Sequence, residues 1–238
     1  MKKAVCILVT IVAIISLSSC FFDSDSINGS GNVITQDRNL PQFSNVRVES
    51  GLNLTLVHGD ALKVVVEADD NVQSHIETTV ENGTLYLSAN GNNFRNVTMN
   101  VTVTMPVINK IEADGGASVE SGNTLLGSDV TVVTSGGSEV KLDIESERVT
   151  AESDSGSSLT LSGKALSLKT SSDSGSSLDA GELTANDVVA EASSGASASV
   201  KPAVSLKATA SSGASISYSG NPQNVVVDRD SGGDVSKQ

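Results

Sequence analysis

The stretch Asp154-Ser155-Gly156-Ser157-Ser158-Leu159-Thr160-Leu161 is one of seven copies of a short frame that repeats between Asp114 and Val235. Each copy contains a glycine, a small residue, a polar residue, an apolar residue and any residue, often followed by a second apolar residue. Successive copies are 18 to 21 residues apart. A fixed period near 20 residues is typical of a solenoid, in which each repeat forms one coil. The opening glycines are Gly116, Gly137, Gly156, Gly175, Gly195, Gly213 and Gly232.

The residues after each glycine alternate with a period of two, which is the period of side chains along a strand. One step after the glycine the residue is small, and three steps after it the residue is apolar in every copy. Two and four steps after it the residues are polar in every complete copy. We therefore predict that the odd positions point into the coil and the even positions face water. The apolar set is Val119, Val140, Leu159, Leu178, Ala198, Ile216 and Val235.

This pattern predicts an all-β fold, a parallel β-helix with about 19 to 20 residues per coil. A helix is disfavoured because apolar residues do not recur at three and four positions, and Gly and Ser are poor helix formers. Most coils contain a second alternating run, so we expect two or three short strands in each coil. These runs are Val130 with Val132, Leu166 with Leu168, Leu206 with Ala208, and Val225 with Val227.

Each glycine is expected at a corner of the coil, where a positive φ or a close backbone approach is needed. Aspartates stand two residues before some of these glycines, and Asp154 and Asp173 belong to consecutive coils. Stacked coils would bring these two residues to within about 5 Å of each other. Paired carboxylates can bind a hard cation such as calcium, but an Asp at this position can also cap its own turn. Asp154 and Asp173 are therefore weak metal candidates, and we predict no metal site.

Composition and charge exclude several classes of function. The chain has 238 residues, no Trp, 3% aromatic residues and a net charge of −13, with no basic stripe that would bind nucleic acid. The two histidines, His58 and His75, lack the spacing of a zinc site and any partner that would make a catalytic triad. We predict no cofactor and no enzymatic activity.

The first 19 residues have the features of a signal peptide. Lys2 and Lys3 precede an apolar run at 4–17 that is too short for an ordinary membrane span. The sequence Leu17-Ser18-Ser19-Cys20 resembles the lipobox of bacterial lipoproteins, in which the cysteine becomes the first mature residue and carries the lipids. We predict lipidation of Cys20 and a flexible tether over 20–30; an ordinary secretory signal with a chance cysteine is the alternative.

Residues 31–112 do not repeat, but they contain alternating runs separated by turn signals. Asn82-Gly83 between two such runs predicts a hairpin. Because the terminal coil of a solenoid needs a cover, we expect this β-rich part to cap the regular coils at 113–235. Residues 31–238 would then form one β-helix domain.

Five short segments stand out along the chain: Ile27-Asn28-Gly29-Ser30-Gly31-Asn32-Val33, Val57-His58-Gly59-Asp60, Asp69-Asp70-Asn71, Glu81-Asn82-Gly83-Thr84-Leu85 and Gly115-Gly116-Ala117. As a set they resemble the bacterial family of "putative auto-transporter adhesin, head GIN domain" proteins. The resemblance covers about residues 27 to 235. It implies a right-handed β-helix, often on a lipoprotein, and it brings no catalytic residues.

Our leading hypothesis is a lipid-anchored, non-enzymatic protein of the cell envelope, expected at the outer membrane on its periplasmic or its surface face. Its rigid polar coils would serve adhesion or the binding of an unknown protein or glycan. The alternative is a glycan-active lyase or hydrolase, since such enzymes also use β-helices. The last coil, near Val235, would leave an open strand edge, so we expect either a homo-oligomer through this coil or a local cap.

Overall fold

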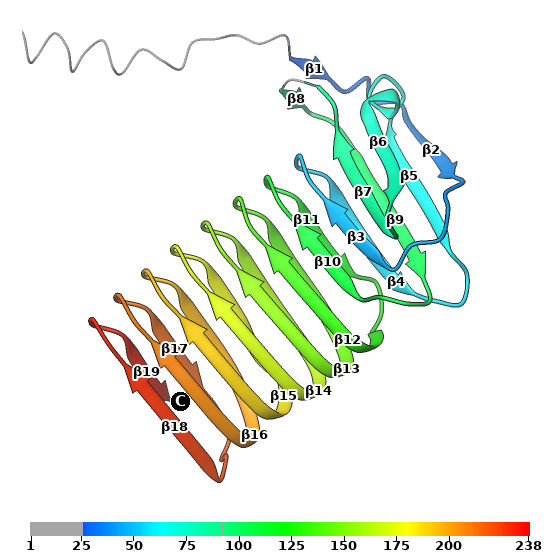
Figure 1. Cartoon of the computed structure of the whole chain (residues 1–238). Helices are drawn as coiled ribbons and strands as arrows, with labels where there is room; N and C mark the ends of the chain where they lie inside the picture. Colours follow the sequence, from blue (N-terminus) through cyan, green and yellow to red (C-terminus); the bar gives the residue numbers. More distant parts are fainter. Residues whose placement is uncertain (1–25, 92) are drawn as a thin grey trace, which may run out of the picture.

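The computed structural model describes residues 26–91 and 93–238, so the expected signal peptide and Cys20 lie outside the described residues. Most of the described chain forms one large sheet that winds into a solenoid, with a capping region at its N-terminal end (Figure 1). In the described part, no helix is long and apolar enough to span a membrane.

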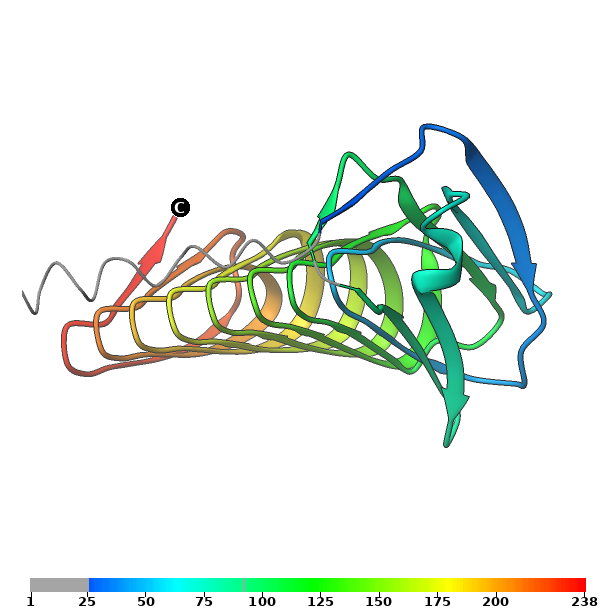
Figure 2. The same cartoon turned by 90° about the horizontal axis from the view of Figure 1, so that it is seen from above.

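The regular coils are built from parallel strands that stack in register. Glu139 pairs with Ser158, Ser158 with Ser177, and Ser177 with Ser197, so each coil repeats after 19 or 20 residues. Seen from above, the coils form a row of stacked loops (Figure 2). The prediction of a parallel β-helix is confirmed. Its strands are β10 (Lys110–Ala113), β11 (Ser118–Ser121), β12 (Leu125–Thr134), β13 (Glu139–Ser153), β14 (Ser158–Ser172), β15 (Ser177–Ala192), β16 (Ser197–Ala210), β17 (Ser215–Tyr218), β18 (Asn224–Arg229) and β19 (Asp234–Lys237).

The core of the coils is narrow and follows the alternation seen in the sequence. All seven apolar residues at the third step are buried, and Val140, Leu159 and Ile216 are fully enclosed. The small residues at the first step are also buried where they are Ala or Ser, including Ser157 and Ala214. The polar residues at the second step are exposed in every coil. The inward and outward assignments are therefore confirmed.

Each corner contains two consecutive residues with positive φ, not one. In the third copy, Ser155 has a φ of 53° and Gly156 a φ of 68°, and the Ser157 N–H donates to the Asp154 carbonyl at 3.2 Å. This is the geometry of a type I′ turn, which suits a sharp reversal. The glycine prediction is confirmed at all seven positions. The left-handed serine that precedes the glycine in five of the corners was not predicted, because a positive φ has a low steric cost only for glycine.

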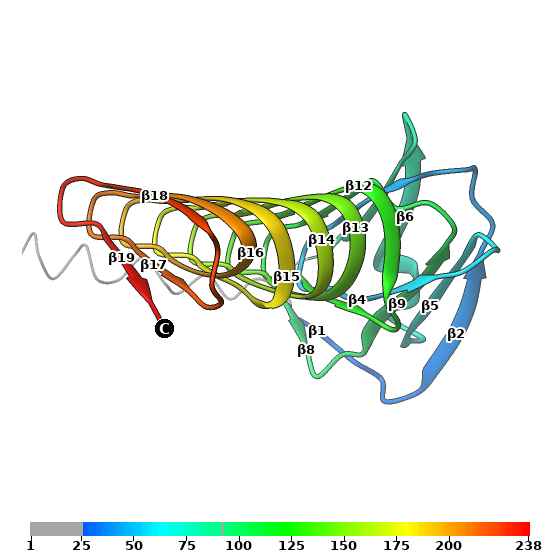
Figure 3. The same ribbon diagram turned by 90° about the horizontal axis from the view of Figure 1, so that it is seen from below.

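Part of the second alternating run lies on the outside of the coils. Leu168 is buried, but Leu166 is 57% exposed, because the chain bends there and the ladder skips from Ala165 to Ser167. Val225 and Val227 are 41% and 38% exposed although they stack on the buried Leu206 and Ala208. They belong to the last coil, whose open side has no further coil against it in the described chain (Figure 3).

The capping region mixes parallel and antiparallel pairing. Strands β3 and β4 form the first coil beneath β10 and β11, and β7 and β9 continue that stack in parallel. The other pairs, β2–β5, β5–β9 and β6–β7, are antiparallel, and a short parallel pair joins β1 to β8. The elements are β1 (Ile27–Asn28), β2 (Val33–Arg38), β3 (Asn45–Val48), β4 (Asn53–His58), β5 (Lys63–Asp69), the 3₁₀-helix η1 (Gln73–His75), β6 (Ile76–Glu81), β7 (Thr84–Ala89), β8 (Phe94–Arg95) and β9 (Met99–Met105).

The predicted hairpin at Asn82-Gly83 is confirmed by the antiparallel pair β6–β7 and by positive φ values of 50° and 75° at these two residues. The tether, in contrast, is shorter than predicted. Ile27 already pairs with Phe94, and the Ser30 N–H donates to the Asn71 side chain at 3.0 Å. The fixed domain therefore begins before residue 31, because polar side chains of the 69–71 turn hold this segment.

A buried carboxylate completes this attachment. Asp69 is only 2% exposed, and its two oxygens accept the N–H groups of Gly31 and Thr98, each at 2.7 Å. Asp70 next to it accepts from the Ser30 hydroxyl at 2.6 Å and from the Asn32 amide at 2.9 Å. The segment at 28–32 and the turn at 69–71, both quoted above for the family resemblance, thus form one hydrogen-bonded unit.

Candidate functional site

One outward-facing sheet surface runs the whole length of the molecule, and we call it the polar face. Eleven strands are joined side by side in the order β2, β5, β9, β4, β11, β13, β14, β15, β16, β17 and β19. Two rows of outward residues cross them, and all but Val65 are polar. The first row is Thr35, Glu67, Asn100, Asn53, Ser118, Glu139, Ser158, Ser177, Ser197, Ser215 and Asp234; the second is Asp37, Val65, Thr102, Thr55, Glu120, Lys141, Thr160, Asp179, Ser199, Ser217 and Ser236.

Side chains of neighbouring strands bond to one another along these rows. The Asn53 amide donates to the Asn100 side-chain oxygen at 3.1 Å, across the boundary between β4 and β9. The hydroxyl groups of Ser199 and Ser217 are 3.2 Å apart. Because the pleated backbone spaces these side chains regularly, the surface presents hydroxyl and amide groups about 5 Å apart. Such a surface suits a polar ligand that is extended along the solenoid axis.

The polar face is hollowed where the capping region meets the coils, and we call this hollow the junction groove. It has a volume of about 380 Å³ and is lined by β4, β5, β9 and β11. Glu67 accepts from the Asn100 amide at 3.4 Å, and Glu120 accepts from the Thr55 hydroxyl at 3.3 Å. The lining residues are Asn53, Leu54, Thr55, Glu67, Asn100, Thr102, Ser118 and Glu120.

The groove is acidic, and the lysines on either side of it form ion pairs with carboxylates that do not line the groove. The Lys141 amine lies 2.5 Å from Glu139, and Lys63 lies 3.5 Å from Asp37. The hydrogen bond from Glu139 raises the pKa of Lys141, and Glu120 adds a weaker attraction. Within residues 26–91 and 93–238, neither Glu67 nor Glu120 forms an ion pair.

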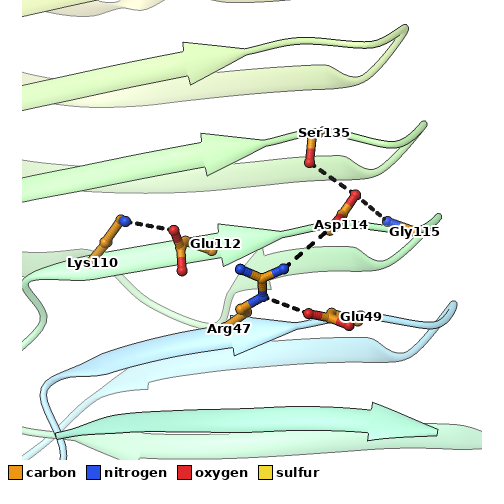
Figure 4. Close-up of polar contacts among 7 residues, drawn as sticks. All are labelled: Arg47, Glu49, Lys110, Glu112, Asp114, Gly115 and Ser135. Atoms are coloured by element: carbon orange, nitrogen blue, oxygen red, sulfur yellow. Dashed lines mark hydrogen bonds and ion pairs between the residues drawn. The ribbon is translucent and has the colours of Figure 1, made fainter. Parts of the chain in front are cut away.

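A second charged group lies on another side of the coils and is already satisfied internally. Arg47 bonds to Glu49 at 2.5 Å and lies 3.9 Å from Asp114, which accepts from the Ser135 hydroxyl at 2.9 Å (Figure 4). The hydrogen bond with Glu49 raises the pKa of Arg47 above its ordinary value. This network ties the first three coils together at their corners, so we assign it to stability and not to binding.

The two weak metal candidates act as turn caps. Asp154 accepts the Ser155 N–H and Asp173 accepts the Ser174 N–H, each at 2.6 Å. Hydrogen bonds, chiefly from the Ser194 side chain and then from Ser193, lower the pKa of Asp173. In the part of the chain that the structure describes, no group of three or more His, Cys, Asp or Glu side chains converges as a metal site would require.

The histidines lie apart in the capping region. His58 is tied through its backbone to the Asn123 side chain, and the His75 ring contacts the Asn90 carbonyl at 2.7 Å and the edge of Phe94. Cys20 lies outside the described residues, so its lipidation stays a prediction.

Sequence reasoning missed the junction groove as a site. Glu120 was recognised as an outward residue, but nothing in the sequence aligned the non-repeating strands with the coils. Glu67, Asn100 and Asn53 join Glu120 only through the pairing of β5 with β9, of β9 with β4 and of β4 with β11.

The comparisons with known proteins agree with this fold. The family described as "Putative auto-transporter adhesin, head GIN domain" matches residues 42–222, and the chain belongs to this family. The family carries the name of adhesins, as do two of the three solved structures described below, and none of these names is that of an enzyme. No curated protein matches the chain.

Solved structures share the architecture at low sequence identity. A putative adhesin from Bacteroides fragilis has a TM-score of 0.84 and 22% identity, covering 89% of this chain and 100% of that chain. A putative lipid binding protein from Parabacteroides distasonis has a TM-score of 0.74 and 16% identity, covering 90% and 100%. A putative adhesin from the same species has a TM-score of 0.73 and 16% identity, with the same coverage. These likenesses show the fold.

Proposed function

We propose that this protein is a lipid-anchored, non-enzymatic protein of the bacterial cell envelope. It binds a polar, hydroxyl-rich ligand along the polar face, with the junction groove as the main contact. The observation that carries the proposal is the hollow in the polar face, lined by amide, hydroxyl and carboxylate groups from four strands. Convergent polar groups in a concave site are typical of ligand recognition. The adhesin names of the family agree with a binding role.

The anchor rests on the lipobox-like sequence that ends at Cys20. Only six residues, 21–26, separate Cys20 from Ile27, the first residue in a described strand, so the domain is held within about 25 Å of the anchored cysteine. The multiple acyl chains of a lipoprotein cysteine anchor stably, whereas one chain is marginal. The proposal therefore places the polar face close to the membrane, where it can meet envelope polymers.

Binding is tested with the chain from Cys20 onward, carrying Cys20→Ser so that no acyl group is attached. A panel of polysaccharides, matrix proteins and lipid vesicles is screened by calorimetry; the vesicles address the name of the Parabacteroides distasonis relative. Ser118→Trp fills the groove and should abolish binding of the captured polymer. Ser171→Trp, on an outward strand of another side, is the control and should bind normally. Equal binding by both variants would refute the groove as the contact.

The anchor is tested separately in cells. The unmodified chain should fractionate with membranes and show an acylated first residue by mass spectrometry, and Cys20→Ser should be released. An unmodified Cys20 in the membrane fraction would refute lipidation. Protease treatment of intact cells then separates the surface face from the periplasmic face of the outer membrane.

A glycan-active enzyme is the alternative, because Glu67 and Glu120 are two carboxylates that line one groove. Glycoside hydrolases use two carboxylates on opposite sides of the bond they cleave. Incubation with polysaccharides should release no reducing ends and no unsaturated products if the protein only binds. Product release that is lost in Glu67→Gln would support the enzyme instead.

A further inference from the structure

The junction groove has more hydrogen-bond acceptors than donors. Glu67 and Glu120 each offer two oxygens, and an ionised carboxylate accepts about four hydrogen bonds. Their contacts inside the protein are neutral and long, at 3.4 Å from the Asn100 amide and 3.3 Å from the Thr55 hydroxyl. Charge-assisted hydrogen bonds are normally shorter, about 2.7 to 2.9 Å. Most of the accepting capacity of both carboxylates therefore stays open toward the groove.

The carboxylates that flank the groove on the polar face differ in this respect. Glu139 is paired with Lys141 at 2.5 Å, and Asp37 with Lys63 at 3.5 Å. The lining of the groove itself contains no Lys, Arg or His among the described residues. Lys141 and Lys63 are thus already engaged, whereas Glu67 and Glu120 bring into the groove two carboxylates that form no ion pair within the described chain.

This arrangement decides which polymers fit. An anionic chain, such as a uronic acid or phosphate polymer, would face two carboxylates and no cation. The hydroxyl groups of a neutral sugar can donate to both carboxylates but bring no opposite charge, and covering an unpaired charge is costly. An ammonium group brings three N–H donors and a positive charge, so it satisfies both the geometry and the electrostatics.

We propose that the groove selects amino-sugar polymers with free amines, whose ammonium groups bind Glu67 and Glu120. This inference rests on the proposed binding function and names its ligand class. Glu67 is on β5 and Glu120 on β11, three strand spacings away, which is about 14 Å of sheet. An oligomer lying along the solenoid axis engages both carboxylates through amines on different units, while its hydroxyl groups meet Asn53, Asn100 and Ser118.

The test compares oligomers of equal length that differ in one group. Glucosamine oligomers, their N-acetylated counterparts and uronic acid oligomers are titrated by calorimetry into the Cys20→Ser chain at low salt. We expect the free amine form to bind at least tenfold more tightly than the acetylated form, and uronic acids to show no binding. Raising the salt from 50 to 300 mM should weaken the amine complex only, because exposed ion pairs are screened.

Two isosteric variants and a charge-matched control locate the contacts. Glu67→Gln and Glu120→Gln should each reduce affinity for the glucosamine oligomer about tenfold, since each removes a charged partner and keeps the shape. Glu152→Gln removes the same charge from an outward position of β13 on another side and should bind as the parent does. Equal losses of affinity in all three variants would show that binding depends only on the net charge of the protein, and would overturn the inference.

The remaining outcomes distinguish the selection of free amines from the proposed binding function. If acetylated and free-amine oligomers bind equally at the groove, the selection of amines is wrong and the proposed binding function stands. If Ser118→Trp binds every oligomer as the parent does, both proposals fall. Calcium is titrated alone as a further arm. If calcium saturates the groove and then excludes the amine-bearing oligomer, in the parent and in both Gln variants alike, the ligand of the groove is a metal ion and not an amine.

Discussion

The capping region and the regular coils enclose their cores in different ways. The cap is filled with large aliphatic side chains, among them Leu54, Leu87 and Met105, and it holds one buried carboxylate, Asp69. The coils combine leucines such as Leu159 with many alanines and with buried hydroxyl groups, such as Ser157 and Thr170. Each side chain of a repeated coil packs against its copies, whereas the cap must cover an end that has no copy beyond it.

The two ends of the solenoid show the same contrast. The cap covers the first coil, but in the described chain no strand pairs with the outer edges of β18 and β19. Arg229 and Lys237 occupy inward positions of this last coil, paired in register with Ala210 and Tyr218. Arg229 donates to the Val235 carbonyl, and Lys237 to the Asn221 side chain at 2.7 Å. Inward charges at a strand edge oppose pairing with another chain.

The largest expected effect comes from uncoupling the cap. Asp69→Ala removes the acceptor of the N–H groups of Gly31 and Thr98, so the segment at 28–32 loses its hold on the cap. Because hydrogen bonds to a charged group contribute about 1.5 to 3 kcal/mol each, we expect the free energy of unfolding to fall by about 3 kcal/mol or more. Urea denaturation measures it, with the exposed Asp60→Ala as control. A loss below about 1 kcal/mol would show that Asp69 does not hold the segment.

The next largest loss of stability is expected from overpacking a corner of a coil. Ala214 is 1% exposed and sits just after the glycine of its coil, so Ala214→Leu has no room for its added carbons. We expect a loss of about 2 kcal/mol, which a thermal melt will register as a lower midpoint. Ala203→Leu, at an exposed position of β16, is the matched control. An unchanged melting temperature for Ala214→Leu would contradict the inward assignment.

A substitution inside the coils should stabilise the protein. The Thr170 hydroxyl is fully buried and has no hydrogen-bond partner among the described residues. Thr170→Val keeps the shape and removes the unsatisfied group, so we expect a gain of about 1 kcal/mol in the free energy of unfolding. Ser172→Ala is the contrasting variant, since its hydroxyl lies 3.0 Å from that of Ser176 and its loss should destabilise. Destabilisation by Thr170→Val would indicate a bound water in the core.

Removing the charge at the open end should change association more than stability. We propose that the parent chain is a monomer and that Arg229→Ala forms end-to-end dimers through β18, where Val225, Val226 and Val227 are exposed. Light scattering at high concentration measures the mass, and Arg95→Ala in the cap is the control. Dimers of the parent chain would instead make the C-terminal coil a homo-oligomer interface.

The smallest expected effect is a dependence on pH at the cap. Hydrogen bonds from Ser30 and then Asn32 lower the pKa of Asp70 in the folded protein. A depressed folded pKa stabilises the fold above the unfolded value, near pH 4, and this contribution is lost as the pH falls through the folded pKa. The stability difference between the parent and Asp70→Asn should therefore shrink between about pH 5 and pH 2 in urea titrations. A constant difference would contradict this role.

The repeating half of the fold could be predicted because its cause is local. Period, corner glycines and inward residues all follow from alternation along a strand, and each coil meets only its neighbours. Leu166 is exposed because a bend shifts the phase of the alternation, and Val225 is exposed because burial there depends on a further coil. The tether boundary was wrong because composition at 27–30 gives no sign of the contacts with 69–71.

The sequence by itself determined the coil, its polar exterior and the anchor hypothesis at Cys20, since these depend on patterns within about 20 residues. Only the tertiary structure decided the junction groove. Glu67 and Glu120 are more than fifty positions apart in the chain, and they share a surface because antiparallel pairing of β5 with β9 extends the sheet of parallel coils. Such non-local pairing is set by how the cap packs on the first coil, which no short-range pattern encodes.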